Sequence, residues 1–257
     1  MRYLWDQYHV YRDGTGALTK LLMPRMAHHL RAWDVTSAAR VDGFAANSNH
    51  VAHRIRKYWR READVVHPPV AVDAFQPVPK PELGEFYLWV GELAPYKMPG
   101  LAIEAFKRLG KPLVVLGGPA QTAQRYEGIA ENIKVLGHVP FATIKEHMAR
   151  CKALIYPGEE DFGIVPVEVM ASGRPVIAYG RGGALDTVID GETGLLFHEQ
   201  SVEGLIEAVE RFEENGLDQC DPARLVAHAA QFDEGAFRAG ISASLAKLGV
   251  ERPALRV

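Results

Sequence analysis

Short apolar runs and helical segments alternate along the chain from residue 86 to residue 215. The apolar runs lack an alternating polar face, which is typical of strands buried on both sides of a parallel sheet. We predict such strands at residues 86–90, 112–116, 133–136, 153–156, 176–179 and 195–197. Apolar residues recur with helical spacing at residues 99–109, 120–131, 141–150, 184–189 and 202–215. This order predicts an α/β fold with a doubly wound parallel sheet.

The first 78 residues hold too few strand candidates for a second sheet of this kind. Only residues 42–46 and 64–67 read as strands, and a helix at 49–61 separates them. Before them, Gly14, Gly16 and Pro24 are expected to interrupt helical stretches.

Four prolines at positions 68, 69, 77 and 79 mark an extended connection after this first part. We therefore expect a partial α/β domain at residues 1–78 and a Rossmann-like domain at residues 79–257. Helices at 222–231 and 234–248 and a frayed tail at 252–257 are expected to close the chain.

Composition adds few constraints. Of the 257 residues, 47% are hydrophobic and 24% charged, with a formal net charge of −3, which is ordinary for a globular enzyme and gives no bias toward nucleic acid. The sequence has no apolar run of about eighteen residues and no signal-peptide core at its start, so we expect a cytoplasmic protein. Cys151 and Cys220 are expected to form neither a disulfide nor a zinc site.

Basic residues gather near one helix. Residues 1–78 contain 11 Lys and Arg against 7 Asp and Glu, and the segment 49–61 carries Arg54, Arg56, Lys57, Arg60 and Arg61. Two interpretations stay open: a solvated face of an amphipathic helix, or a surface that meets anionic lipid headgroups or a lipid-diphosphate acceptor at the inner face of the membrane. Asn47-Ser48 before this helix is expected to cap it.

Two carboxylates flank the turn after the predicted strand at 153–156. Glu160 lies on the loop at the strand's carboxyl end, and Glu168 follows eight positions later, within the expected first turn of the next helix. Helix starts favour anions because their backbone N–H groups are unpaired. The amides of residues 163–165 would then face a diphosphate while the carboxylates accept hydrogen bonds from sugar hydroxyls. Alternatively, Glu168 only stabilises its helix end and Glu160 is a solvated loop residue.

A second amide-rich turn follows the next strand. Gly173 is expected to end the helix, and Gly180-Arg181-Gly182-Gly183 opens another one after the strand at 176–179. Because parallel strands end at the same edge of a sheet, loops on two adjacent strands predict a cleft there.

Together these segments resemble the donor half of retaining glycosyltransferases of the GT-B type, family 4. The similarity is greatest to bacterial mannosyltransferase-like members that act in polysaccharide assembly. It rests on residues 160–168, 170–178, 182–183, 87–97 and 101–106, and it extends from Met1 to about residue 245. The paired glutamates are a signature of that family.

The resemblance implies roles for individual residues. It implies that Lys97 neutralises the leaving diphosphate, that Glu168 holds the ribose hydroxyls and that Glu160 holds the transferred sugar. Glu160 and Lys97 are thus the expected catalytic residues. The expected donor-binding residues are Gly91, Lys97, His138, Glu160, Phe162, Gly163, Ile164, Val165 and Glu168. Many family members carry an arginine where this chain has Glu92, a loss for which Arg181 or Arg174 could compensate.

The resemblance also implies GDP-mannose as the favoured donor and a glycan or lipid-linked acceptor. It implies no cofactor and no metal, because amides and lysine would neutralise the diphosphate, and the histidines show no metal-ligand spacing. A nucleotide-sugar epimerase and a non-catalytic nucleotide-sugar-binding module stay open as alternatives. Resembling enzymes take the acceptor on an amino-terminal domain, so we expect this chain to begin partway through it and to bind donor with little transfer by itself.

Overall fold

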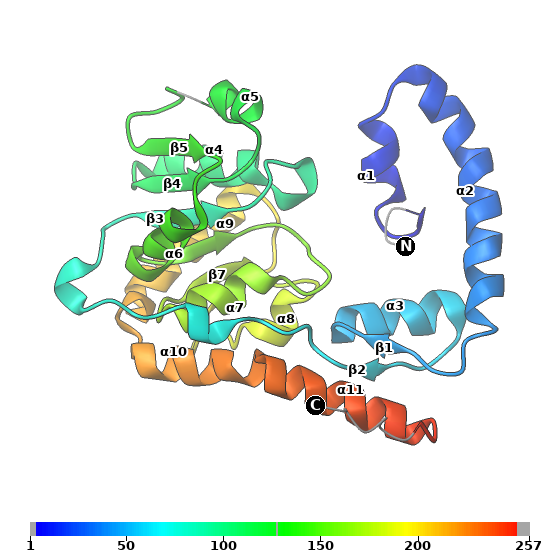
Figure 1. Cartoon of the computed structure of the whole chain (residues 1–257). Coiled ribbons are helices and arrows are strands. Elements are labelled where there is room, and N and C mark those ends of the chain that lie inside the picture. The colour runs from blue at the N-terminus through cyan, green and yellow to red at the C-terminus, as the bar shows by residue number, and fades with distance from the viewer. Residues whose placement is uncertain (1–3, 127, 251–257) are drawn as a thin grey trace.

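A parallel sheet of six strands forms the larger part of the molecule (Figure 1). The structure is a computed structural model that describes residues 4–126 and 128–250. The strands are β3 (Tyr87–Val90), β4 (Leu113–Leu116), β5 (Ile133–Gly137), β6 (Leu154–Tyr156), β7 (Val176–Tyr179) and β8 (Gly194–Phe197). Their order is β5-β4-β3-β6-β7-β8. The winding direction reverses between β3 and β6, so the predicted doubly wound sheet is confirmed.

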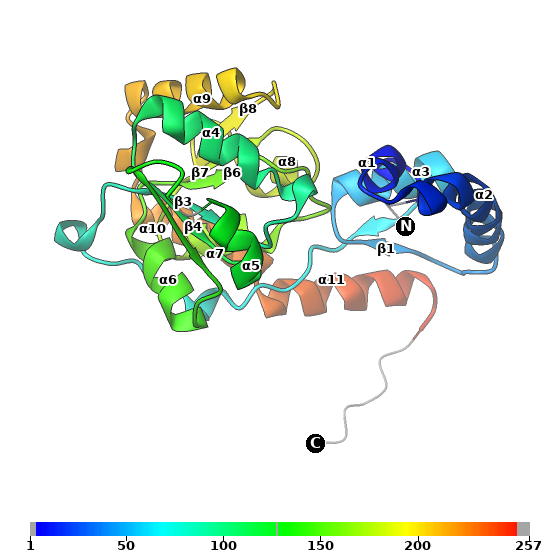
Figure 2. The same cartoon turned by 90° about the horizontal axis from the view of Figure 1, so that it is seen from above.

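Helices cover both faces of this sheet (Figure 2). Successive side chains of a strand point to opposite faces, so Leu88 joins one apolar cluster while Tyr87 and Trp89 join the other. The cluster of Tyr87 and Trp89 is covered by α4 (Pro99–Leu109) and α9 (Val202–Glu214). The cluster of Leu88 is covered by α6 (Phe141–Arg150), α7 (Ile164–Ala171) and α10 (Pro222–Ala229).

The predicted helix at 120–131 is much shorter in the structure. It consists of α5 (Ala120–Ala123) and a 3₁₀ turn at Gln124–Tyr126, after which Gly128 adopts a positive φ of 69°. The helix predicted at 184–189 likewise ends early, as α8 (Ala184–Thr187).

The prediction that Pro24 interrupts a helix is wrong. Helix α2 (Ala17–Ala38) runs through it, after the separate helix α1 (Tyr8–Asp13). A proline inside a helix leaves the carbonyl four residues earlier without its donor, here that of Lys20. Because Lys20 lies in an exposed turn, water can satisfy that carbonyl, and the helix continues.

The amino-terminal part is built around two short parallel strands, β1 (Ala45–Ala46) and β2 (Asp64–Val65), which flank α3 (Asn49–Trp59). The last helix, α11 (Glu234–Lys247), returns to this part, where Ser244 Oγ donates to Asp64 Oδ2 at 2.8 Å (Figure 1). The division of the chain at residue 78 therefore stays a prediction, because the end of the chain packs on its beginning.

Helix α3 starts as expected and carries its charges in ion pairs. The hydroxyl of Ser48 accepts from the backbone N–H of Val51 at 3.1 Å, so the predicted cap is confirmed. Arg54 binds both Asp6 and Asp161, at 2.9 and 2.7 Å. Arg56 pairs with Glu62 at 2.7 Å, and Lys57 with Asp6 at 3.3 Å. Among the described residues, no helix is both long and apolar enough to cross a membrane.

A carboxylate on α9 ties this helix to the amino edge of the sheet. Glu213 accepts hydrogen bonds from Tyr87 at 2.8 Å, Lys111 at 2.7 Å and Lys152 at 3.2 Å. Burial alone would raise the pKa of Glu213, but these three donors outweigh it and lower the pKa to about 2.

Glu213→Gln should lower the free energy of unfolding by roughly 1–2 kcal/mol at neutral pH, because the negative charge that pairs with Lys111 and Lys152 is lost and one acceptor oxygen is replaced by an amide donor. A lowered pKa in the folded state gives stability that is present above the unfolded pKa and is lost as the pH falls through the folded one. The difference from wild type in urea unfolding should therefore narrow from about pH 5 to about pH 3. Glu210→Gln, on the exposed face of the same helix, is the matched control; a pH-independent difference would contradict the charge network.

Candidate functional site

Lys97 and Glu160, the two expected catalytic residues, meet at the carboxyl edge of the sheet. Lys97 ends a 3₁₀ turn (Pro95–Lys97) after β3, and Glu160 lies on the loop after β6. Since β3 and β6 are neighbouring parallel strands, both loops leave the same edge. Lys97 Nζ lies 2.9 Å from Glu160 Oε1, and the two side chains are only 21% and 16% exposed.

The backbones of these two loops are in close contact. A Cβ on Gly158 would lie 2.9 Å from Lys97 Cα, so only glycine fits at this point. Gly91 follows β3 directly, and the stem of Lys97 runs past it. The space enclosed by Lys97, Glu160 and Tyr156 amounts to about 10 Å³, roughly one water at most. The ion pair thus leaves no room for a ligand between the two side chains.

Helix α7 begins against this loop with free first-turn amides. Gly163 has a φ of 87°, a conformation that favours glycine, and it turns the chain from the loop into the helix. No side chain in the described part of the chain caps the helix, and Ile164 at its first position is exposed. The amides of Ile164 and Val165 can therefore donate to an anion, whereas Pro166 has no N–H.

Glu168 lies one turn further along α7 than expected. The helix starts at Ile164, so Glu168 is its fifth residue and belongs to the second turn; the prediction of the first turn is wrong. Its carboxylate is half-buried and has no hydrogen-bond or ion-pair partner among the described residues, and burial raises its pKa. A desolvated carboxylate without a donor destabilises the folded chain, unless a ligand supplies the donors.

Phe162 anchors the loop that carries Glu160. Its ring is buried and stacks on His67 with ring centroids 5.4 Å apart. This expected donor-binding residue therefore holds the loop against the core. His67 Nε2 in turn lies 3.2 Å from Asp186 Oδ2, which also accepts from the backbone N–H of Asn49 at 2.7 Å. Burial alone would raise the pKa of Asp186, but these hydrogen bonds hold it below the usual range. Sequence reasoning missed His67 and Asp186, because no local pattern distinguishes them.

The glycine-rich turn after β7 packs on the same loop. The Gly183 N–H donates to the carbonyl of Glu160 at 2.8 Å, and a Cβ on Gly183 would lie 2.2 Å from Phe162 Cα. The two loops thus lie at one edge of the sheet and pack directly against each other, while the cleft expected there stays a prediction. Arg181, exposed on this turn, lies 3.9 Å from Glu159, and His50 of α3 lies 3.6 Å from the same carboxylate.

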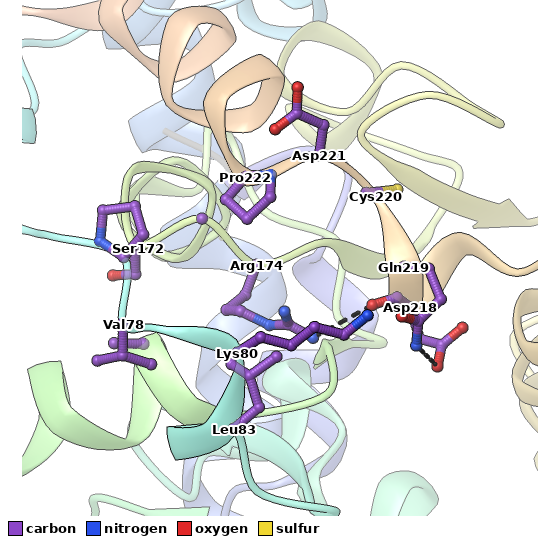
Figure 3. A pocket seen from close by; sticks show the side chains of 13 residues that line it. Val78, Lys80, Leu83, Ser172, Arg174, Asp218, Gln219, Cys220, Asp221 and Pro222 are labelled. Carbon is purple, nitrogen blue, oxygen red and sulfur yellow. Dashed lines mark hydrogen bonds between the residues drawn. The ribbon is translucent and has the colours of Figure 1, made fainter.

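Arg174 cannot replace the arginine that many family members carry at the position of Glu92, although the sequence left that role open to it. It precedes β7 and therefore lies at the opposite, amino edge of the sheet. Its guanidinium is buried and donates to the carbonyls of Cys151 at 2.6 Å and Lys152 at 3.0 Å. Arg174 lines a pocket of about 170 Å³ together with Lys80, and Figure 3 shows both side chains. Of the two arginines, only Arg181 is on the same edge as Lys97.

His138 is exposed directly after β5, on the same edge as Lys97 but two strands away from β3. Its place is compatible with a base pocket, and no side-chain contact of a described residue fixes it further. Within residues 4–126 and 128–250, no three His, Cys, Asp or Glu side chains gather as metal ligands.

Known proteins resemble the chain in sequence and in fold. A D-inositol 3-phosphate glycosyltransferase of Mycobacteroides abscessus is 30% identical over 167 residues, which cover 57% of this chain and 38% of that protein. The D-inositol 3-phosphate glycosyltransferase of Acidothermus cellulolyticus is 30% identical over 254 residues, which cover 86% of this chain and 55% of that protein. An uncharacterised glycosyltransferase of Methanocaldococcus jannaschii is 33% identical over 129 residues, covering 48% and 37%. The chain thus spans between about a third and just over half of these relatives.

Solved structures share the fold at lower identity. Sucrose-phosphate synthase from Thermosynechococcus elongatus superposes with a TM-score of 0.75 at 20% identity, covering 85% of this chain and 61% of that one. HepE of Anabaena, in complex with UDP and glucose, superposes with a TM-score of 0.70 at 22% identity, covering 84% of this chain and 66% of that one. The profile of the family described as glycosyl transferases group 1 matches residues 73–231, more than half of the chain. The chain therefore belongs to the group 1 glycosyl transferase family.

Proposed function

We propose that this chain binds a nucleoside diphosphate sugar at the carboxyl edge of its sheet and transfers the sugar, with retention and with little turnover by the chain alone, to an acceptor hydroxyl. The observation that carries the proposal is the Glu168 carboxylate, which is desolvated without a partner in the described chain, on the helix whose first amides are uncapped. Evolution tolerates such a cost at binding sites, where the ligand offsets it.

Each group in the site has a role under this proposal. The diphosphate lies against the amides of Ile164 and Val165, with Lys97 as its counter-charge. Glu168 accepts from the ribose hydroxyls. When Lys97 turns to the phosphate, Glu160 becomes an acceptor for hydroxyls of the transferred sugar. As the bond from the anomeric carbon to the diphosphate breaks, Lys97 and the amides stabilise the charge on the departing oxygen.

We further propose GDP-mannose as donor and a glycan or lipid-linked acceptor, in keeping with the family 4 resemblance, without a divalent metal. Two comparisons suggest other choices. The relatives named D-inositol 3-phosphate glycosyltransferases suggest a different acceptor, and the UDP complex of HepE suggests a different base. Contact of the basic segment 49–61, which contains α3, with a membrane stays part of this proposal. Arg56 and Lys57 are largely exposed in spite of their ion pairs, which leaves them able to face lipid headgroups.

The decisive assay is acceptor-dependent release of nucleoside diphosphate, with GDP-mannose and UDP-glucose offered in parallel and the product's anomeric configuration read by NMR. Release with retained configuration supports the proposal. Isomerised sugar formed without acceptor would identify an epimerase, and nucleotide binding without any turnover would identify a binding module.

Glu168→Gln should change stability and affinity in opposite directions. The free energy of unfolding should rise by about 1 kcal/mol at pH 7, because a desolvated charge is removed. Since the folded pKa of Glu168 is raised, the cost of its charge is relieved as the pH falls through that pKa, and the variant's advantage should shrink there. Affinity for nucleoside diphosphate, measured by calorimetry, should fall by about tenfold.

Glu207→Gln, on an exposed face of α9, is the matched control and should leave both quantities unchanged. A stabilised Glu168→Gln variant with unchanged nucleotide affinity would remove Glu168 from the ribose site.

Lys97→Ala should weaken binding of the nucleoside diphosphate by about tenfold and binding of the nucleoside much less, because the lost interaction is with phosphate charge. Calorimetric titration of wild type and variant with both ligands gives the loss of affinity for each. Lys107→Ala, an exposed lysine on α4, serves as control. Equal losses for both ligands would mean that Lys97 acts through packing.

A further inference from the structure

The pocket beside Arg174 lies at the amino edge of the sheet, away from the proposed donor site (Figure 3). Three segments meet around it: residues 77–83, the turn at 172–174 between α7 and β7, and residues 218–222 at the start of α10. Its volume is about 170 Å³. Because a cavity of about 10–15 Å³ already holds a water, this pocket has room for a small organic molecule.

Arg174 brings a buried charge to this pocket. The residue is only 5% exposed, and its Nε and Nη2 donate to the carbonyls of Cys151 and Lys152. These acceptors are neutral, and no carboxylate of a described residue forms an ion pair with the guanidinium. Burial lowers the pKa of Arg174, and the charge of Asp218 offsets this only in part. A buried cation without a counter-charge is costly to the folded chain.

One donor of this guanidinium stays unused. Nη1 has no hydrogen-bond partner among residues 4–126 and 128–250, yet it is not sealed from solvent. Lys80 lines the same pocket, is exposed, and likewise has no ion-pair or hydrogen-bond partner in the described chain. Two cations without counter-charges thus border one pocket, and both can donate to one anion.

Two carboxylates also line the pocket, and they limit which anion fits. Asp221 accepts from the backbone N–H of Ala223 at 3.0 Å, and Figure 3 shows its carboxylate pointing away from Arg174. The carboxylate of Asp218 accepts from Gln219 Nε2 at 2.9 Å, and only its backbone carbonyl accepts from Arg174, at 3.5 Å. Because like charges repel, these neighbours disfavour a phosphate dianion more than a singly charged carboxylate.

The rest of the lining is mostly apolar and includes Pro77, Val78, Leu83, Ala149 and Pro222. We propose that this pocket binds a small carboxylate with a short apolar body, whose head group accepts from Arg174 Nη1 and Lys80 Nζ. A purely structural role for Arg174 accounts for Nε and Nη2, which bind backbone carbonyls, but not for Nη1 or Lys80. The inference does not rest on the proposed sugar transfer. Helix α7 begins beside the donor loop at Ile164 and ends beside this pocket at Ala171, so the two sites lie at its opposite ends.

The test is an NMR titration of the whole chain with butyrate, its neutral analogue butyramide and inorganic phosphate, followed at the backbone amides of Gly173 and Gln219. Butyrate should bind about tenfold more tightly than butyramide, because the carboxylate accepts charge-assisted hydrogen bonds. Lys80→Gln should weaken butyrate binding by about threefold, as expected for an exposed cation. Asp218→Asn should strengthen it, because a repelling charge is removed.

Lys107→Gln is the matched control and should leave butyrate binding unchanged. Lys107 is also an exposed lysine without a partner in the described chain, and it lies on α4, over the other face of the sheet. Arg174→Gln should abolish butyrate binding, and Lys80→Gln keeps the site testable if removal of the buried arginine prevents folding.

Three results would overturn the proposal. Equal affinities for butyrate and butyramide, or a Lys80→Gln variant with wild-type affinity, would remove the two cations from a binding role. Tighter binding of inorganic phosphate than of butyrate would overturn the choice of a carboxylate. Displacement of butyrate by a nucleoside diphosphate would place the probe in the donor site, whereas a carboxylate held at the amino edge should not compete with the nucleotide.

Discussion

The site depends on one close approach between backbones, that of Gly183 and Phe162. A Cβ at position 183 would lie 2.2 Å from Phe162 Cα, so no larger residue fits there without moving the loop. This contact, the Gly183 hydrogen bond to Glu160 and the buried ring of Phe162 fix the loop between β6 and α7. Glu160 can be held toward Lys97 because its loop is pinned on both sides.

The charged side chains that join elements of the fold differ from Glu168 in their partners. Glu213, Asp186 and Arg54 each have two or more strong partners, and they join elements. Glu168 has none among the described residues, although it is more deeply placed than many surface carboxylates. Interactions that hold the fold are thus satisfied internally, whereas the group proposed for ligand binding is not.

The sequence predicted the sheet because its strands are short apolar runs with clear ends, and local pattern decides that feature. It also placed Glu160 and Lys97 on one edge, since that follows from parallel strands. The turn of α7 that holds Glu168 was misplaced, because Gly163 starts the helix before Pro166 and its backbone conformation cannot be read from composition. Contacts such as Arg54–Asp161 and His67–Asp186 join residues 107 and 119 positions apart, and no local signal specifies them.

The ion pair between Lys97 and Glu160 has a consequence for the end of a reaction cycle. Under the proposed function, a nucleoside diphosphate that has lost its sugar would bind Lys97 and leave Glu160, only 16% exposed, without its counter-charge, whereas the intact donor would bring hydroxyls to Glu160. Re-formation of the 2.9 Å pair would then compete with the spent nucleotide for Lys97 and favour its release. By this means the ion pair of the empty site would favour substrate over product.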